Sequence, residues 1–169
     1  MIDNGHIELK HFGDFFSKLD YERPLDATRG LSYCNLADEN RYKKEFVKAC
    51  IHKGAAENVE LYLQDHFSWL KKHSFAISLM EPGMILPLHT DKYGFYKKTY
   101  SISNSDSVCR IIIFLEDWKP GHISQVGNKL TPQWKAGDWI CWTGETKHMA
   151  ANLGHENRYV LQITGLLKT

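Results

Sequence analysis

One short motif in this chain pairs a histidine with a carboxylate at a spacing that suits metal binding. The segment ILPLHTDKYG contains His89 and Asp91, and no other histidine of the chain is followed two positions later by an aspartate. Residues i and i+2 of an extended segment point to the same side, so one imidazole and one carboxylate can hold the same ion. A lone His-x-Asp pair arises by chance with roughly even odds, so a third ligand must come from elsewhere.

The expected third ligand is His148, in the segment GETKHMAANLG. It follows a Gly-Asp turn and the apolar run WICW, so it is predicted to begin the next strand. Two histidines and one carboxylate form a facial triad that leaves coordination positions open, which is typical of non-haem Fe(II) sites. His89, Asp91 and His148 are therefore the predicted catalytic metal ligands.

Arg158 is the fourth candidate residue, ten positions beyond His148. If 158–164 is a strand, Arg158 shares a face with Gln162, and an arginine inside a small barrel is costly unless it meets an anion. A guanidinium can hold a carboxylate by two parallel hydrogen bonds. A dicarboxylate that chelates the metal at one end and pairs with Arg158 at the other would satisfy both sites. The alternative is a salt bridge between Arg158 and Glu156 or another acidic residue.

The elements that must position these residues divide the chain into two parts. Apolar residues recur at helical spacing three times before residue 74, which predicts a helical N-terminal part. These stripes are Leu9, Phe12, Phe15, Phe16 and Leu19; then Tyr42, Phe46, Val47, Cys50 and Ile51 after a possible N-cap at Asp38; then Val59, Tyr62, Leu63, His66, Phe67 and Leu70.

Short apolar runs separated by Gly and Pro predict strands from residue 74 onward. The expected strands are SFAISLM, VCRIIIFLEDW at 108–118, HISQV, WICW, a strand from His148 and RYVLQITGLL. The prediction is one domain over 1–169, mainly β with N-terminal helices. In it, residues 1–73 pack on a double-stranded β-helix (jelly-roll) core at 74–169.

The order of these motifs resembles the 2-oxoglutarate/Fe(II)-dependent oxygenases over about residues 74 to 165. A Pro-Gly turn is followed by ILPLHTD, RIIIFLED and KAGDWICW, and then by a histidine with an arginine ten residues later. The order is most similar to the aspartyl/asparaginyl β-hydroxylase-like and prolyl-hydroxylase-like branches. Aspartyl/asparaginyl β-hydroxylases commonly lack the carboxylate ligand that Asp91 provides here, so their substrate preference does not transfer.

The resemblance implies an oxidoreductase, a dioxygenase that hydroxylates its substrate and releases succinate and CO2. Fe(II) would be the metal and 2-oxoglutarate the co-substrate. Arg158 would bind the distal carboxylate of 2-oxoglutarate. Arg110 lies on the central strand, where such enzymes often carry a second polar contact to the co-substrate.

Two further features could belong to the site. His122 follows Pro120-Gly121 and could line the pocket. The segment 92–107, KYGFYKKTYSISNSDS, is long for a hairpin loop and combines aromatic with basic residues. It is either a lid that receives an anionic or planar substrate or a solvated loop.

Composition excludes several other classes. The 21 basic and 20 acidic residues nearly balance, so neither nucleic acid nor a membrane is expected as a partner. None of the four cysteines forms a Cys-x-x-Cys pair, which argues against structural zinc. A polar N-terminus and short apolar runs predict a cytoplasmic protein with reduced thiols. The resemblance implies a small-molecule or peptide substrate.

Two alternatives remain from the sequence. A cupin-type metalloenzyme would use the triad without 2-oxoglutarate, and Arg158 would then need no carboxylate. A non-catalytic barrel would bind a ligand or protein and would not need all three metal ligands.

Overall fold

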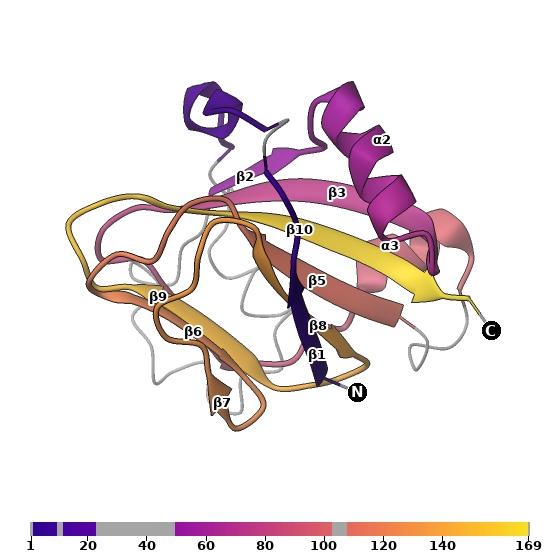
Figure 1. Cartoon of the computed structure of the whole chain (residues 1–169). Coiled ribbons are helices and arrows are strands. Elements are labelled where there is room, and N and C mark those ends of the chain that lie inside the picture. Colours follow the sequence, from indigo (N-terminus) through magenta and orange to yellow (C-terminus); the bar gives the residue numbers. More distant parts are fainter. Residues whose placement is uncertain (1, 10–11, 23–49, 103–107, 169) are drawn as a thin grey trace.

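The computed structural model describes residues 2–9, 12–22, 50–102 and 108–168, and these form two facing β-sheets with two α-helices and one 3₁₀ helix (Figure 1). The larger sheet has the strand order β1-β8-β5-β10-β3-β2. Its strands are β1 (Ile2–His6), β8 (Asp138–Thr143), β5 (Val108–Phe114), β10 (Arg158–Leu167), β3 (Leu70–Met80) and β2 (Cys50–Lys53).

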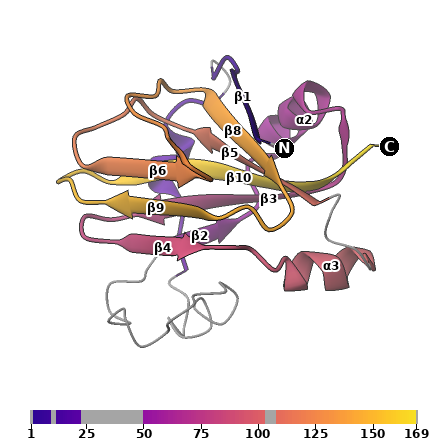
Figure 2. The ribbon, with the colours of Figure 1, turned by 90° about the horizontal axis from the view of Figure 1, so that it is seen from below.

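The smaller sheet faces the larger one and has the order β4-β9-β6-β7 (Figure 2). Its strands are β4 (Ile85–His89), β9 (His148–Asn152), β6 (His122–Val126) and β7 (Lys129–Leu130). The helices are η1 (Phe15–Lys18), α2 (Glu57–His66) and α3 (Gly94–Tyr100). All pairings between these strands are antiparallel. This mainly β arrangement is consistent with the expected double-stranded β-helix.

Two apolar layers follow from the alternation of side chains along the central strands. On β10, Leu161 and Ile163 point to the face of the larger sheet that lies away from the smaller sheet. There they are buried with Val59 and Leu63 of α2 in the largest core cluster. Val160 faces the other way, between the sheets, with Phe114 and Trp142. The layer under α2 therefore closes the outer face, and the layer between the sheets carries the candidate site.

The strands expected from residue 74 onward are confirmed in place, and HISQV and RYVLQITGLL match β6 and β10 residue for residue. The strand expected at 108–118 is shorter, because β5 ends at Phe114. The third helical stripe is confirmed as α2, although it ends at His66 and Leu70 already begins β3.

The expectation for residues 9–19 is wrong in its extent. Among the described residues of this segment, only the four-residue 3₁₀ helix η1 forms, because Gly13 has φ +53°, a left-handed conformation that interrupts a right-handed helix. Within the second stripe, Cys50 and Ile51 lie in β2, where they pair with β3. Residues 42–47 of that stripe lie outside the described residues.

The sequence analysis also missed β1, because IDNGH is polar and carries a turn-forming Asn-Gly pair. The strand lies at the edge of the larger sheet and is mostly exposed, so it needs no apolar alternation. At Gly5 the Trp139 ring of β8 lies directly against the backbone, where a Cβ atom would come within 2.6 Å of it. Among the described residues, no helix is long and apolar enough to cross a membrane.

Two leucines of α2 provide a matched test of the outer layer. Leu63 is 0% exposed and Leu61 is 57% exposed on the same helix. Leu63→Ala should lower the free energy of unfolding by about 2–5 kcal/mol, because it removes buried methyl groups and leaves a cavity. Leu61→Ala should change it by no more than about 0.5 kcal/mol. Urea denaturation of both variants measures the difference, and equal losses would contradict this packing of α2.

Candidate metal centre

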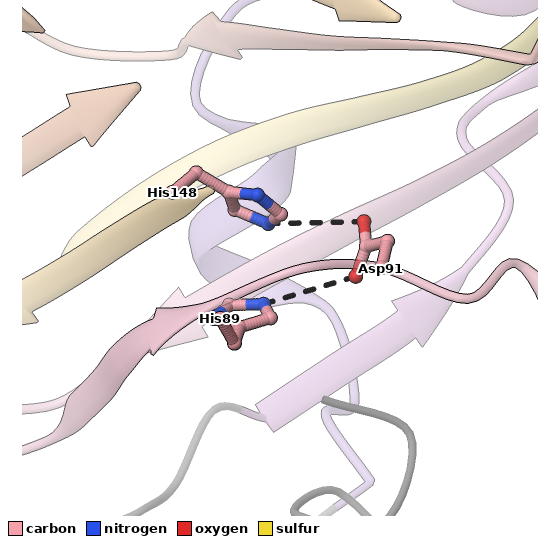
Figure 3. A group of neighbouring side chains, drawn as sticks. All are labelled: His89, Asp91 and His148. Carbon is pink, nitrogen blue, oxygen red and sulfur yellow. Dashed lines mark ion pairs between the residues drawn. The ribbon is translucent and has the colours of Figure 1, made fainter. Parts of the chain in front are cut away.

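The three predicted ligands come together between β4 and β9 at one end of the smaller sheet (Figure 3). His89 ends β4 and is paired in register with His148, which begins β9. Asp91 follows two residues after β4, and its carboxylate points at both rings. One ligand atom from each of these residues lies within 4.8 Å of the others.

A bulge in β4 helps to aim His89 into the site. The register between β4 and β9 shifts between Leu86 and His89, at the segment that contains Pro87. Proline cannot donate a ladder hydrogen bond, and bulges commonly redirect a side chain next to a functional site.

Each imidazole is held so that its Nε2 atom faces the carboxylate. His89 Nδ1 donates a hydrogen bond to the Pro87 carbonyl at 2.6 Å, and His148 Nδ1 donates to the Thr146 carbonyl at 2.9 Å. A carbonyl can only accept, so Nδ1 carries the proton and Nε2 keeps its lone pair. His89 Nε2 lies 3.7 Å from Asp91 Oδ1, and His148 Nε2 lies 3.8 Å from Asp91 Oδ2.

The protonation states also suit a metal. Burial lowers the pKa of His148 to about 4 and lowers the pKa of His89, so both rings are neutral near pH 7. Burial alone would raise the pKa of Asp91, but Arg110, His148 and His89 together hold it below its ordinary value. Metal–ligand bonds of about 2.0–2.2 Å place neighbouring ligands about 3 Å apart, so binding requires only a small inward shift. The triad could therefore bind a metal ion.

Arg110 lies directly behind the triad. Its Nη2 and Nε atoms donate to Asp91 Oδ2 at 2.9 and 3.2 Å, and its Nη1 atom donates to Gln162 Oε1 at 3.0 Å. Its guanidinium also lies 5.5 Å from the centre of the Tyr93 ring. Burial opposes the charge of Arg110, but Asp91 and Tyr93 together outweigh burial and raise the pKa of Arg110. The role predicted for Arg110, a contact to the co-substrate, stays a prediction. In the described structure its guanidinium donates to Asp91 and Gln162.

This ion pair leads to a prediction about stability. Arg110→Met should lower the free energy of unfolding of the metal-free protein by about 3–5 kcal/mol, because it leaves the Asp91 charge without its partner. Added Mn²⁺ should restore part of that loss, since the ion supplies the missing cation. Denaturation with and without Mn²⁺ measures both effects. Lys135→Met removes an exposed ion pair with Asp117 and should cost about 0–1 kcal/mol in either condition.

Arg158 begins β10, as predicted, and is 3% exposed. Its guanidinium lies 5.4 Å from the Trp134 ring and 5.7 Å from the Phe114 ring, and its Nη1 atom contacts Met80 Sδ at 3.3 Å. Within the described part of the chain it pairs with no carboxylate, so the expected alternative of a salt bridge with Glu156 does not form there. Burial lowers its pKa to about 10, which leaves it charged at neutral pH.

Sequence reasoning placed the main residues of this region but missed three of their neighbours. Gln162 was expected on the face of Arg158, yet nothing in the sequence linked it to Arg110. Tyr93 was grouped with a possible lid, but it is buried beneath Arg110, and the following residues form α3. Trp134 lies in an irregular segment with no periodic signal. It stacks on Phe114 with ring centres 4.0 Å apart.

Fold and site together define a mainly β protein with a His–Asp–His group between its sheets. No protein-family model matches the chain, and no curated protein matches it. A prolyl-4-hydroxylase from Pseudomonas putida matches with a TM-score of 0.60 at 13% identity, over 98% of this chain and 92% of that one.

Two other solved structures match more distantly. A predicted oxalate decarboxylase from Thermotoga maritima has a TM-score of 0.48 at 15% identity, over 89% of this chain and 96% of that one. KdgF from a Halomonas species has a TM-score of 0.46 at 8% identity, over 90% of both chains. At such identities the likeness to the prolyl-4-hydroxylase shows a shared fold and nothing finer.

Proposed function

We propose that this protein is an Fe(II)- and 2-oxoglutarate-dependent oxygenase with a double-stranded β-helix core. It would hydroxylate an amino-acid side chain or a small metabolite and release succinate and CO2. The observation that carries the proposal is the buried guanidinium of Arg158, which lies on the inner face of the larger sheet and pairs with no described carboxylate. A buried cation of this kind is a ready partner for one end of a dicarboxylate.

The residues present fit both groups. His89 and His148 offer Nε2 lone pairs, and Asp91 offers the carboxylate that completes a facial set for Fe(II). Arg158 Nε is buried without a hydrogen-bond partner among the described residues. When bound, Fe(II) and 2-oxoglutarate would supply the oxidising chemistry, and the protein would supply orientation and a dry site.

Each residue then has a definite task. The carbonyl groups of Pro87 and Thr146 fix the two rings, and Arg110 fixes the Asp91 carboxylate. Arg158 holds the distal carboxylate of the co-substrate. Trp142 packs against His148 with ring centres 4.6 Å apart and keeps water from that side of the site.

The shared fold with a prolyl-4-hydroxylase supports the proposal without naming a substrate. A cupin-type metalloenzyme that does not use 2-oxoglutarate is the second candidate. The rings of Phe114 and Trp134 favour it, because cation–π contacts stabilise Arg158 even without an anion.

An anaerobic titration of the metal-free protein with Fe²⁺, with and without 2-oxoglutarate, tests the proposal. We expect a weak visible charge-transfer band that requires both additions, and succinate once air is admitted. Iron binding without the band would favour the cupin-type candidate. No iron binding would contradict both and leave a non-catalytic barrel.

A further inference from the structure

A further histidine, outside the metal-binding group, lies at the buried end of the inter-sheet layer, beside Arg158. His122 begins β6 and is 4% exposed, and it is paired in register with Asn152 of β9. Its ring stacks on Trp134 with centres 6.3 Å apart and planes 19° from parallel. The same indole ring lies under the Arg158 guanidinium at 5.4 Å. His122 and Arg158 are therefore held against one aromatic platform, away from the three metal ligands.

One nitrogen atom of His122 and one of Arg158 lack a hydrogen-bond partner among the described residues. His122 Nε2 lies 3.1 Å from the Glu156 carbonyl, which can only accept, so Nε2 carries a proton. His122 Nδ1 and Arg158 Nε are both buried and have no hydrogen-bond partner among the described residues. Buried polar atoms are rarely left unpaired in native proteins, which indicates that a ligand or an ordered water belongs here.

The surrounding charges decide which form of His122 is present. Arg158 and Lys119 are the cations of this region, and Glu116 and Glu156 are its anions. Lys119 bridges the two glutamates at 2.9 and 3.1 Å. The four charges cancel, so a protonated His122 would add an uncompensated buried charge. Burial and then Arg158 lower the pKa of His122, and the Glu156 carbonyl and Glu116 oppose this effect only in part.

A carboxylate arriving beside Arg158 reverses this balance. It brings one negative charge into a region that is neutral overall, and its oxygens can only accept hydrogen bonds. His122 can donate to it only through Nδ1, and that requires a second proton on the ring.

We propose that His122 is a second anchor for the distal carboxylate of the co-substrate and takes up one proton from solvent as that carboxylate binds. The inference rests on the proposed function and deepens it. The proton adds to Nδ1, and no other bond forms or breaks. Arg158 alone would hold any carboxylate, whereas the pair couples co-substrate affinity to pH. Affinity should fall by up to tenfold for each unit of rising pH between the pKa that His122 has in the free protein and the higher pKa that it has in the complex.

Isothermal titration calorimetry of the anaerobic Fe²⁺ protein tests this coupling. 2-Oxoglutarate is compared with 2-oxobutyrate, which has the same chelating end but no distal carboxylate. Each is titrated at one pH in two buffers with different heats of ionisation, so that the buffer dependence gives the protons taken up. We expect 2-oxoglutarate to take up close to one proton more than 2-oxobutyrate.

Variants separate the anchor from a packing role. His122→Gln can still donate to the Glu156 carbonyl but cannot gain a proton. It should lose the extra proton uptake and bind 2-oxoglutarate roughly 10- to 100-fold more weakly, as expected for a lost charge-assisted hydrogen bond. Its affinity for 2-oxobutyrate should stay unchanged. His122→Asn should give the same results as His122→Gln. His155→Asn is the control: His155 is exposed in the neighbouring loop, so this variant should match the parent protein.

Equal proton uptake for the two ligands would overturn the inference while leaving the proposed function intact. So would an equal loss of both ligands in His122→Gln, because that result indicates a packing role. Failure of the parent protein to bind either ligand would instead contradict the proposed function, and the anchor with it.

Discussion

Asp91→Ala should abolish succinate formation and weaken Fe²⁺ binding by more than 100-fold. Loss of a group that only supports a ligand typically costs 10- to 100-fold in metal affinity, and Asp91 is itself the carboxylate of the triad. The variant should also be less stable by about 3–5 kcal/mol, because Arg110 loses the oxygen that accepts two of its hydrogen bonds. Calorimetric Fe²⁺ titration and urea denaturation measure these two effects separately.

Asp138→Ala provides the matched control. Asp138 also pairs with a histidine, His6, at 2.9 Å, but both side chains are substantially exposed and lie on β8 and β1. This variant should bind Fe²⁺ like the parent protein. Undiminished Fe²⁺ affinity in Asp91→Ala would remove this residue from the metal site.

Arg158→Ala should weaken 2-oxoglutarate far more than it weakens iron. Loss of one partner from a buried, hydrogen-bonded charge pair costs about 2–5 kcal/mol, which corresponds to roughly 30- to 4,000-fold in affinity. Fe²⁺ affinity should stay within a few-fold, because Arg158 touches none of the three ligands in the described structure. The charge-transfer band, titrated with each component in turn, gives both affinities.

Arg158→Lys distinguishes recognition from simple charge. Lysine keeps the positive charge but cannot form two parallel hydrogen bonds with a carboxylate, so its affinity for 2-oxoglutarate should fall between those of the parent and the alanine variant. Parallel loss of iron and 2-oxoglutarate in Arg158→Ala would indicate misfolding. Unchanged 2-oxoglutarate affinity would favour the cupin-type alternative.

The strands expected from residue 74 onward were predictable because each buries an alternating or continuous apolar run between clear turns. Glu81-Pro82-Gly83 and Lys135 to Asp138 form turns where the sequence placed them, with hydrogen bonds from Met84 N to Glu81 O and from Asp138 N to Lys135 O. His89 and His148 could be grouped as ligands in advance because each was expected beside a strand end, and the structure then pairs them in register.

The unpredicted features depend on contacts between distant segments. Strand β1 forms because β8 offers a free edge, which a local pattern cannot reveal. Arg110 and Asp91 meet across 19 residues, and Arg110 reaches Gln162 across 52. The spacing of Phe12, Phe15 and Phe16 is that of a helix, so the sequence pattern gave no warning. The backbone at Gly13 instead adopts a left-handed conformation, which a helix cannot continue through.

The placement of the triad has a mechanical consequence. His89 and His148 belong to the smaller sheet, while Asp91 is fastened by Arg110 to β5 and β10 of the larger one. A bound ion would thus cross-link the two sheets at the end where the triad lies. Occupancy at 100 times the dissociation constant would add about 2.7 kcal/mol to the free energy of unfolding. Removal of the ion by a chelator would allow the two sheets to separate locally at this end first. Resistance to proteolysis would therefore increase with the concentration of bound metal.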